Sequence, residues 1–201
     1  MERVDSLAFD LHKWMYLPYG IACVLIRREH DQRNTFSLTP EYLSHGEGER
    51  GMTGCDVPWF CDYGFQLSRG FQALKAWMSL KEFGVHKYGR LIQQNIDQAH
   101  YLAALIDKAP ELELATTVRL NVVCFRYIKA GLDKNMLDEI NKQIIIELQE
   151  QGIAVVSGTI VNHKYVLRAA ITNHRSCRED FDVLVPEIKR LGKELSLLSL
   201  K

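Results

Sequence analysis

Two short apolar runs stand near the start of the chain. Residues 4–9 are rich in strand-forming side chains, and residues 21–26 are apolar without interruption. Runs of this length are typical of strands that are buried on both faces. The pattern therefore predicts two buried strands with a loop between them. A buried strand so close to residue 1 needs neighbours, so we expect a preceding segment that is missing or belongs to a separate chain.

The next part of the chain is mostly polar. Residues 28–36 predict a turn or a short helix, and residues 39–41 have the composition of a helix start. Residues 45–56 combine Gly, Glu and Asp without an apolar period, which predicts a mobile loop.

Apolar residues then recur at helical spacing in two successive segments. Ser68 can cap the first segment, and Gly84 interrupts the pattern before the second, which runs from about residue 87 to 109. We expect the apolar stripe of the first helix to lie in the core. This stripe consists of Phe71, Leu74, Trp77, Met78 and Leu80.

Pro110 marks a change of pattern, and we place a domain boundary there, between residues 1–109 and 110–201. The second part alternates β-prone runs with amphipathic segments. This order predicts a small two-layer α+β domain, with antiparallel strands and the helices on one face. The expected strands are 111–115, 122–128, 153–156 and 165–171, and the expected helices are 136–151 and 180–197.

Composition narrows the class of protein. The 201 residues carry 25 basic and 25 acidic side chains, so no net charge favours nucleic acid or an anionic membrane as partner. No apolar stretch approaches the ~20 residues that span a bilayer, and charged residues interrupt the start, where a signal peptide would be apolar. The cysteines are odd in number and fit no zinc or disulfide framework, and no histidine pair has metal-ligand spacing. We therefore expect a cytoplasmic protein with reduced thiols and no metal.

Lys13 is the candidate for covalent chemistry. It follows the first predicted strand, between His12 and Trp14. Partial burial or a neighbouring positive group lowers the pKa of a lysine amine, which can then attack a carbonyl carbon. Most lysines are solvated surface residues, so the spacing alone also fits a lysine without function.

The segment Asp10-Leu11-His12-Lys13-Trp14 resembles the cofactor-lysine segment of the group II pyridoxal-phosphate decarboxylases, which include the aromatic amino-acid, histidine and glutamate decarboxylases. Residues 67–77 are similar to the Arg-led helix of that family, and residues 120–126 and 164–171 are similar to two strands of its small domain. The four motifs occur in the family's order. The resemblance implies an α/β fold, namely the C-terminal portion of a fold-type-I enzyme: the end of the large domain, followed by a small α+β domain.

By this resemblance, the amine of Lys13 holds pyridoxal 5′-phosphate covalently. His12 would lie close to the cofactor phosphate, or would serve only in packing. Asp10 matches a position near the phosphate. A carboxylate repels a phosphate unless a donor intervenes, so Asp10 could instead hold the backbone turn.

In the family, a Gly-rich loop closes over the active site of the neighbouring subunit, and a tyrosine on the loop protonates the substrate carbon. The corresponding loop here is residues 43–66, and the alignment places either Phe60 or Tyr63 at the tyrosine position. A phenol can donate a proton, whereas a phenyl ring cannot. With Phe60 at this position, the resemblance implies an aldehyde-forming relative. The aromatic residues of the segment could also serve only as an apolar anchor.

Three arginines could bind a carboxylate through their planar fork. Arg168 lies on a predicted strand in the region where fold-type-I enzymes bind the substrate carboxylate. Arg69 and Arg126 are alternatives, and each could instead form a structural ion pair.

The resemblance implies a carboxy-lyase that decarboxylates an L-amino acid, with an aromatic substrate favoured. It is a C-terminal part, because the residues that stack on the cofactor and cradle its phosphate belong to the family's first half. We expect a homodimer or a complementing N-terminal half as partner. The alternatives are an aldehyde-forming relative and a non-catalytic remnant.

Overall fold

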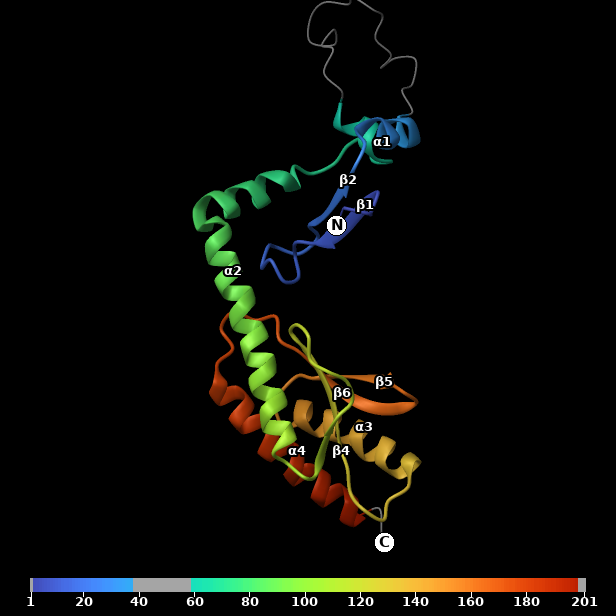
Figure 1. Cartoon of the computed structure of the whole chain (residues 1–201), viewed down its shortest axis with the longest axis vertical. Helices are drawn as coiled ribbons and strands as arrows, with labels where there is room; N and C mark the ends of the chain where they lie inside the picture. Colours follow the sequence, from blue (N-terminus) through green and yellow to red (C-terminus); the bar gives the residue numbers. More distant parts are fainter. Residues whose placement is uncertain (1, 38–58, 199–201) are drawn as a thin grey trace, which may run out of the picture. The chain divides into compact units, whose positions relative to one another are not determined.

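The computed structural model describes residues 2–37 and 59–198, and these divide into two compact units, 1–84 and 85–201. The division falls within α2 (Gln72–Asp107) (Figure 1). At Gly84 the backbone of α2 is not helical, with φ 71° and ψ 157°. The predicted break between two helices at Gly84 is therefore confirmed. The domain boundary at residues 109/110 stays a prediction.

The first unit begins with a hairpin. Strands β1 (Ser6–Asp10) and β2 (Ala22–Ile26) pair antiparallel, from Ser6 opposite Ile26 to Asp10 opposite Ala22. The connecting loop is closed by the backbone N–H of Leu17, which donates to the carbonyl of Leu11 at 3.2 Å. Both predicted strands are present.

The prediction that these strands are buried is wrong for the described chain. Phe9, Val24 and Leu25 are 37%, 50% and 55% exposed. The physical reason is that the described part of the first unit holds only this two-stranded sheet, so its apolar side chains lack a covering layer. An apolar run shows that a strand can be buried, but the burying layer must come from other residues.

A short helix, α1 (Glu29–Phe36), follows β2, which confirms a helix within residues 28–36. The 3₁₀ helix η2 (Phe60–Tyr63) packs against it, because the side-chain amide of Gln32 donates to the carbonyl of Tyr63 at 2.7 Å. The expected helix start at residues 39–41, and residues 43–58 of the expected loop, lie outside the described residues.

The first half of α2 carries the predicted apolar stripe, but the stripe is not core in the described chain. Phe71, Trp77 and Met78 are 71%, 59% and 57% exposed. Helical spacing correctly identified a helix with one apolar face. It could not identify what covers that face.

The second unit is an antiparallel sheet with helices packed on it. The strands are β3 (Leu112–Leu114), β4 (Val122–Tyr127), β5 (Ser157–Val161) and β6 (Lys164–Ala170), in the order β3-β4-β6-β5. Helices α3 (Lys134–Glu150) and α4 (Arg178–Leu198) pack on this sheet and on each other (Figure 1). Alternate side chains of β4, those of Val123, Phe125 and Tyr127, join the second half of α2 in the same core. The predicted two-layer α+β arrangement is confirmed.

The expected strand at residues 153–156 is wrong. Gly152 has a φ of 67°, and the N–H groups of Ile153 and Ala154 both bond to the carbonyl of Leu148. The backbone therefore wraps the end of α3, while Val156 contributes to the core. An apolar run of this length fits either a strand or a capped helix end, because both bury alternate apolar side chains.

The sheet and α3 are joined by side chains as well as by packing. The last paired residues of β4 and β6 are Phe125 and Leu167. Beyond this pair, the buried amide of Asn141 accepts from the N–H of Tyr127 at 2.7 Å and donates to its carbonyl at 2.9 Å. Asn141 thus satisfies two backbone groups of β4 from the helix. Within the described stretches of chain, no helix is long and apolar enough to span a bilayer.

Candidate active site

Lys13 and Asp10 form an ion pair at the start of the β1–β2 loop. Asp10 is the last residue of β1, and the loop turns immediately, with the N–H of Tyr16 bonded to the carbonyl of Lys13 at 3.3 Å. This turn brings Nζ of Lys13 to 2.5 Å from Oδ2 of Asp10. The hydrogen bond from Lys13 holds the pKa of the Asp10 carboxyl below its ordinary value. The Lys13 side chain is 68% exposed, so its amine is accessible to a ligand.

His12 is held in one orientation by the same loop. Its Nδ1 lies 2.7 Å from the carbonyl oxygen of Ile21, which can only accept, so Nδ1 carries the proton in this contact. The backbone N–H of His12 bonds to the same oxygen at 3.1 Å. The ring meets that of Tyr19 edge-on, with centroids 4.9 Å apart. The sequence did not indicate Ile21 and Tyr19 as partners, because each depends on how the loop closes.

Tyr63 and Phe60 both belong to η2 but have different surroundings. The hydroxyl of Tyr63 donates to Oε1 of Glu29 at 2.5 Å, which raises the pKa of the phenol. Phe60 is 78% exposed. The guanidinium of Arg69 lies over the Phe60 ring, 5.9 Å from its centroid, and donates to the Phe60 carbonyl at 2.6 Å.

Sequence analysis missed Glu29 altogether. It lies in the acidic first turn of α1, where a carboxylate is common for helix stability alone. Its pairing with Tyr63 spans 34 positions, and no spacing rule connects residues so far apart. Arg69 was considered only for a carboxylate or an ion pair, and its described contacts are with the backbone and ring of Phe60.

Arg168 and Arg126 lie in the second unit, on neighbouring strands. Arg168 stands opposite Cys124 on β4, and its guanidinium lies 3.5 Å from Oγ of Ser157. Burial raises the pKa of the Cys124 thiol, and the charge of Arg168 counters part of this rise. Arg126 is 2% exposed and meets Oδ1 of Asp138 on α3 at 3.3 Å. Arg126 is therefore in a structural ion pair, one of the two roles expected for it.

The class of protein now follows from fold and sequence together. The model of the pyridoxal-dependent decarboxylase conserved domain matches residues 1–128. The chain belongs to this family of enzymes, whose cofactor is pyridoxal phosphate.

Individual relatives agree with the family. An aromatic-L-amino-acid decarboxylase from Bacillus atrophaeus is 36% identical over 202 residues, which cover 98% of this chain and 40% of the relative. Tyrosine decarboxylase 3 from Petroselinum crispum is 28% identical over 175 residues, which cover 85% of this chain and 33% of the relative. The crystal structure of Oryza sativa TDC with PLP and tryptamine matches 96% of this chain and 40% of that one, with a TM-score of 0.86 and 26% identity. The chain thus spans about 40% of the length of these proteins.

The residues around Lys13 fit part of a pyridoxal phosphate site. The cofactor carries an aldehyde, which combines with a primary amine, and the exposed amine of Lys13 is held only by a carboxylate at the surface. His12 is oriented by Ile21 through Nδ1, which leaves Nε2 as its other polar atom. Among the described residues, no group of three or more His, Cys, Asp or Glu side chains could hold a metal ion.

Proposed function

We propose that this chain is the C-terminal part of a pyridoxal-phosphate-dependent decarboxylase that acts on an L-amino acid, with an aromatic side chain favoured. The observation that carries the proposal is the exposed amine of Lys13, on a loop whose sequence matches the cofactor-lysine motif. The printed names of the relatives, aromatic-L-amino-acid decarboxylase and tyrosine decarboxylase, support an aromatic substrate.

In this proposal each residue has a stated task. Lys13 holds the cofactor, and His12 and Asp10 stand beside it, near the cofactor phosphate. When bound, pyridoxal phosphate withdraws electrons from the substrate carbon that loses carbon dioxide. Tyr63 returns a proton to that carbon, and Arg168 binds the substrate carboxylate. A raised pKa suits Tyr63 for this task, because it keeps the phenol protonated until the proton is needed.

A second candidate function is formation of an aldehyde from the same substrates. The observation that favours it is Phe60, an exposed aromatic side chain of η2 that has no proton to donate. If Phe60 and not Tyr63 reaches the substrate, protonation fails and oxidative products follow.

The proposal includes a partner polypeptide. The apolar side chains of β1, β2 and the first half of α2 are exposed in the described chain, and exposed apolar surface of this kind is costly in water. A polypeptide equivalent to the first part of the relatives would cover it, and the complete enzyme is proposed as a homodimer. A cytoplasmic location is also proposed, and the free thiols of Cys23, Cys61, Cys124 and Cys177 support it.

The experiment is reductive trapping of the cofactor. The chain is incubated with pyridoxal phosphate, alone and with a polypeptide that covers the relatives' first part, and is then treated with borohydride and mapped by peptide mass spectrometry. We expect a pyridoxyl label on Lys13, and loss of that label in Lys13→Ala. Lys81→Ala is the matched control, because Lys81 is an exposed lysine of the same unit and should leave the label on Lys13 unchanged.

Two outcomes would decide against the proposal. Equal labelling of many surface lysines, with no preference for Lys13 in the presence of the complementing part, would favour a non-catalytic remnant. With Lys13 labelled, the measurement of carbon dioxide, ammonia and peroxide from aromatic amino acids separates the decarboxylase from the aldehyde-forming enzyme.

A further inference from the structure

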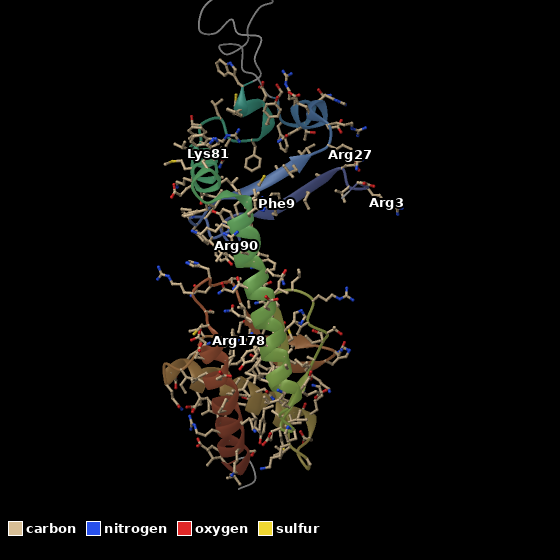
Figure 2. All side chains as sticks on the ribbon, turned by 60° about the vertical axis from the view of Figure 1, so that its left-hand side comes forward. Arg3, Phe9, Arg27, Lys81, Arg90 and Arg178 are labelled. Atoms are coloured by element: carbon tan, nitrogen blue, oxygen red, sulfur yellow. The ribbon has the colours of Figure 1, made fainter. Side chains whose placement is uncertain are left out.

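A pocket of about 470 Å³ lies in the second unit, between α2 and the segment that leads into α4. Its lining includes Arg90, Gln94, Asp97 and Gln98 from α2, and Ser176 and Arg178 from the other side. Arg90 and Arg178 are labelled on their two elements in Figure 2. None of these residues has a task in the proposed decarboxylation.

The wall of the pocket is built by side-chain amides. The Nε2 groups of Gln94 and Gln98 both donate to the carbonyl of Ser176, and that of Gln94 also lies 3.3 Å from the carbonyl of His174. Asn95 donates to Oε1 of Gln98 at 3.1 Å, and both of these side chains are buried. The loop before α4 is therefore fastened to α2 without a ligand, so the pocket is formed in advance.

The positive charges of the pocket are not neutralised. Neither Arg90 nor Arg178 has a carboxylate within ion-pair distance among the residues that the structure describes. Arg178 lies over the ring of Tyr101, 5.1 Å from its centroid, and the hydroxyl of Tyr101 donates to Asp182 at 2.6 Å. The stacking orients the guanidinium and leaves its N–H edge available.

The carboxylates near the pocket are already engaged. Asp97, on the pocket wall, accepts from the amide of Gln93 at 2.8 Å. Asp180 accepts from the backbone N–H of Cys177 at 3.0 Å, and this bond uses a free donor at the start of α4. The attraction for an anion therefore comes from the two guanidinium groups and not from the helix end.

We propose that this pocket binds a small oxyanion, the carboxylate or phosphate group of a metabolite, between Arg90 and Arg178. A guanidinium matches the spacing of two oxygen atoms on such a group, and two guanidinium groups can hold one anion from both sides. The volume is that of a small-molecule site. Binding would tie α2 to the start of α4 and would stabilise the second unit by mass action.

The test uses the full chain, labelled with ¹⁵N and titrated with inorganic phosphate and, separately, with malonate, each to about 20 mM, a range that covers millimolar affinity. We expect saturable shifts of the amide signals of residues 90–98 and 174–178. The anion that binds more tightly shows whether the natural group is a phosphate or a carboxylate.

Variants identify the groups that bind. Arg90→Gln and Arg178→Gln should each weaken binding about tenfold, because each removes a charge-assisted pair of hydrogen bonds. Arg178→Lys, which keeps the charge but loses the fork, should have an intermediate effect. Arg119→Gln is the matched control, since Arg119 is an exposed arginine of the same unit outside the pocket lining. An absence of saturable shifts, or an equal loss of affinity in Arg119→Gln, would overturn the proposal.

Discussion

The hydroxyl of Tyr63 donates a 2.5 Å hydrogen bond to Oε1 of Glu29 and so joins η2 to α1. The carboxylate stabilises the protonated phenol, and the pKa of Tyr63 lies above its ordinary value for this reason first. Because the pKa is raised on folding, the bond stabilises the protein below the ordinary tyrosine pKa. This contribution is lost as the pH rises through the folded value.

The first prediction is that Glu29→Gln lowers the pKa of Tyr63 toward that of a free tyrosine. The amide still accepts a hydrogen bond but carries no charge. NMR of isotope-labelled tyrosine rings across an alkaline titration measures the change. Tyr101 is an internal control, because its pKa is raised by Asp182 and should stay where it is. A Tyr63 titration curve identical in both proteins would contradict the structure of this pair.

The second prediction concerns Asp10. In Lys13→Ala the pKa of the Asp10 carboxyl should rise toward its ordinary value, because its hydrogen-bond donor is gone. A depressed carboxyl pKa stabilises the fold above the unfolded value, and the contribution is lost as the pH falls through the folded value. Carbon-detected NMR of the carboxyl signals measures it. An unchanged Asp10 pKa in Lys13→Ala would show that the ion pair does not form in solution.

The third prediction separates Tyr63 from Phe60 in the assembled enzyme. If Tyr63 donates the proton, Tyr63→Phe should reduce amine formation about 100-fold or more, the usual contribution of a general acid, and raise the share of aldehyde, ammonia and peroxide. Phe60→Tyr should then leave the product ratio unchanged. Phe65→Tyr, in the same segment, controls for adding a phenol. A changed ratio in Phe60→Tyr would assign the loop position to Phe60.

The fourth prediction tests the bond between helix and sheet. Asn141→Ala should lower the free energy of unfolding by about 2–4 kcal/mol, since it leaves the buried N–H and carbonyl of Tyr127 without their partner. Lys142→Ala, the exposed neighbour, should change it by only a few tenths of a kcal/mol, because its ion pair with Glu139 is at the surface. Urea denaturation compares the two, and equal losses would contradict the assigned role of Asn141.

The fifth prediction compares two glycines. A Cβ at Gly192 of α4 would overlap the ring of Tyr127, so Gly192→Ala should destabilise the second unit by about 1–3 kcal/mol. At Gly89 in α2 a Cβ meets no atom within 4 Å, and Gly89→Ala should stabilise the helix by about 0.5–1 kcal/mol. Thermal denaturation should show shifts of opposite sign.

The comparison of sequence and structure follows a consistent physical division. Local periodicity predicted the helices and most strands, because 3.6-residue and two-residue repeats are properties of one segment. The same signal failed at residues 153–156, where an apolar run wraps the end of α3, and at the Phe71–Leu80 stripe, where the covering layer is not part of the described chain.

The sequence by itself determined the family, through the Lys13 motif and three further segments, and it determined the α+β character of the second unit. Only the tertiary structure decided that Glu29 holds Tyr63, that Asn141 replaces strand pairing at Tyr127, and that Arg90 and Arg178 line one pocket. Each of these pairs joins residues whose distance in sequence carries no periodic signal. Their contact depends on how complete elements pack, because side chains meet only after the backbone between them has folded.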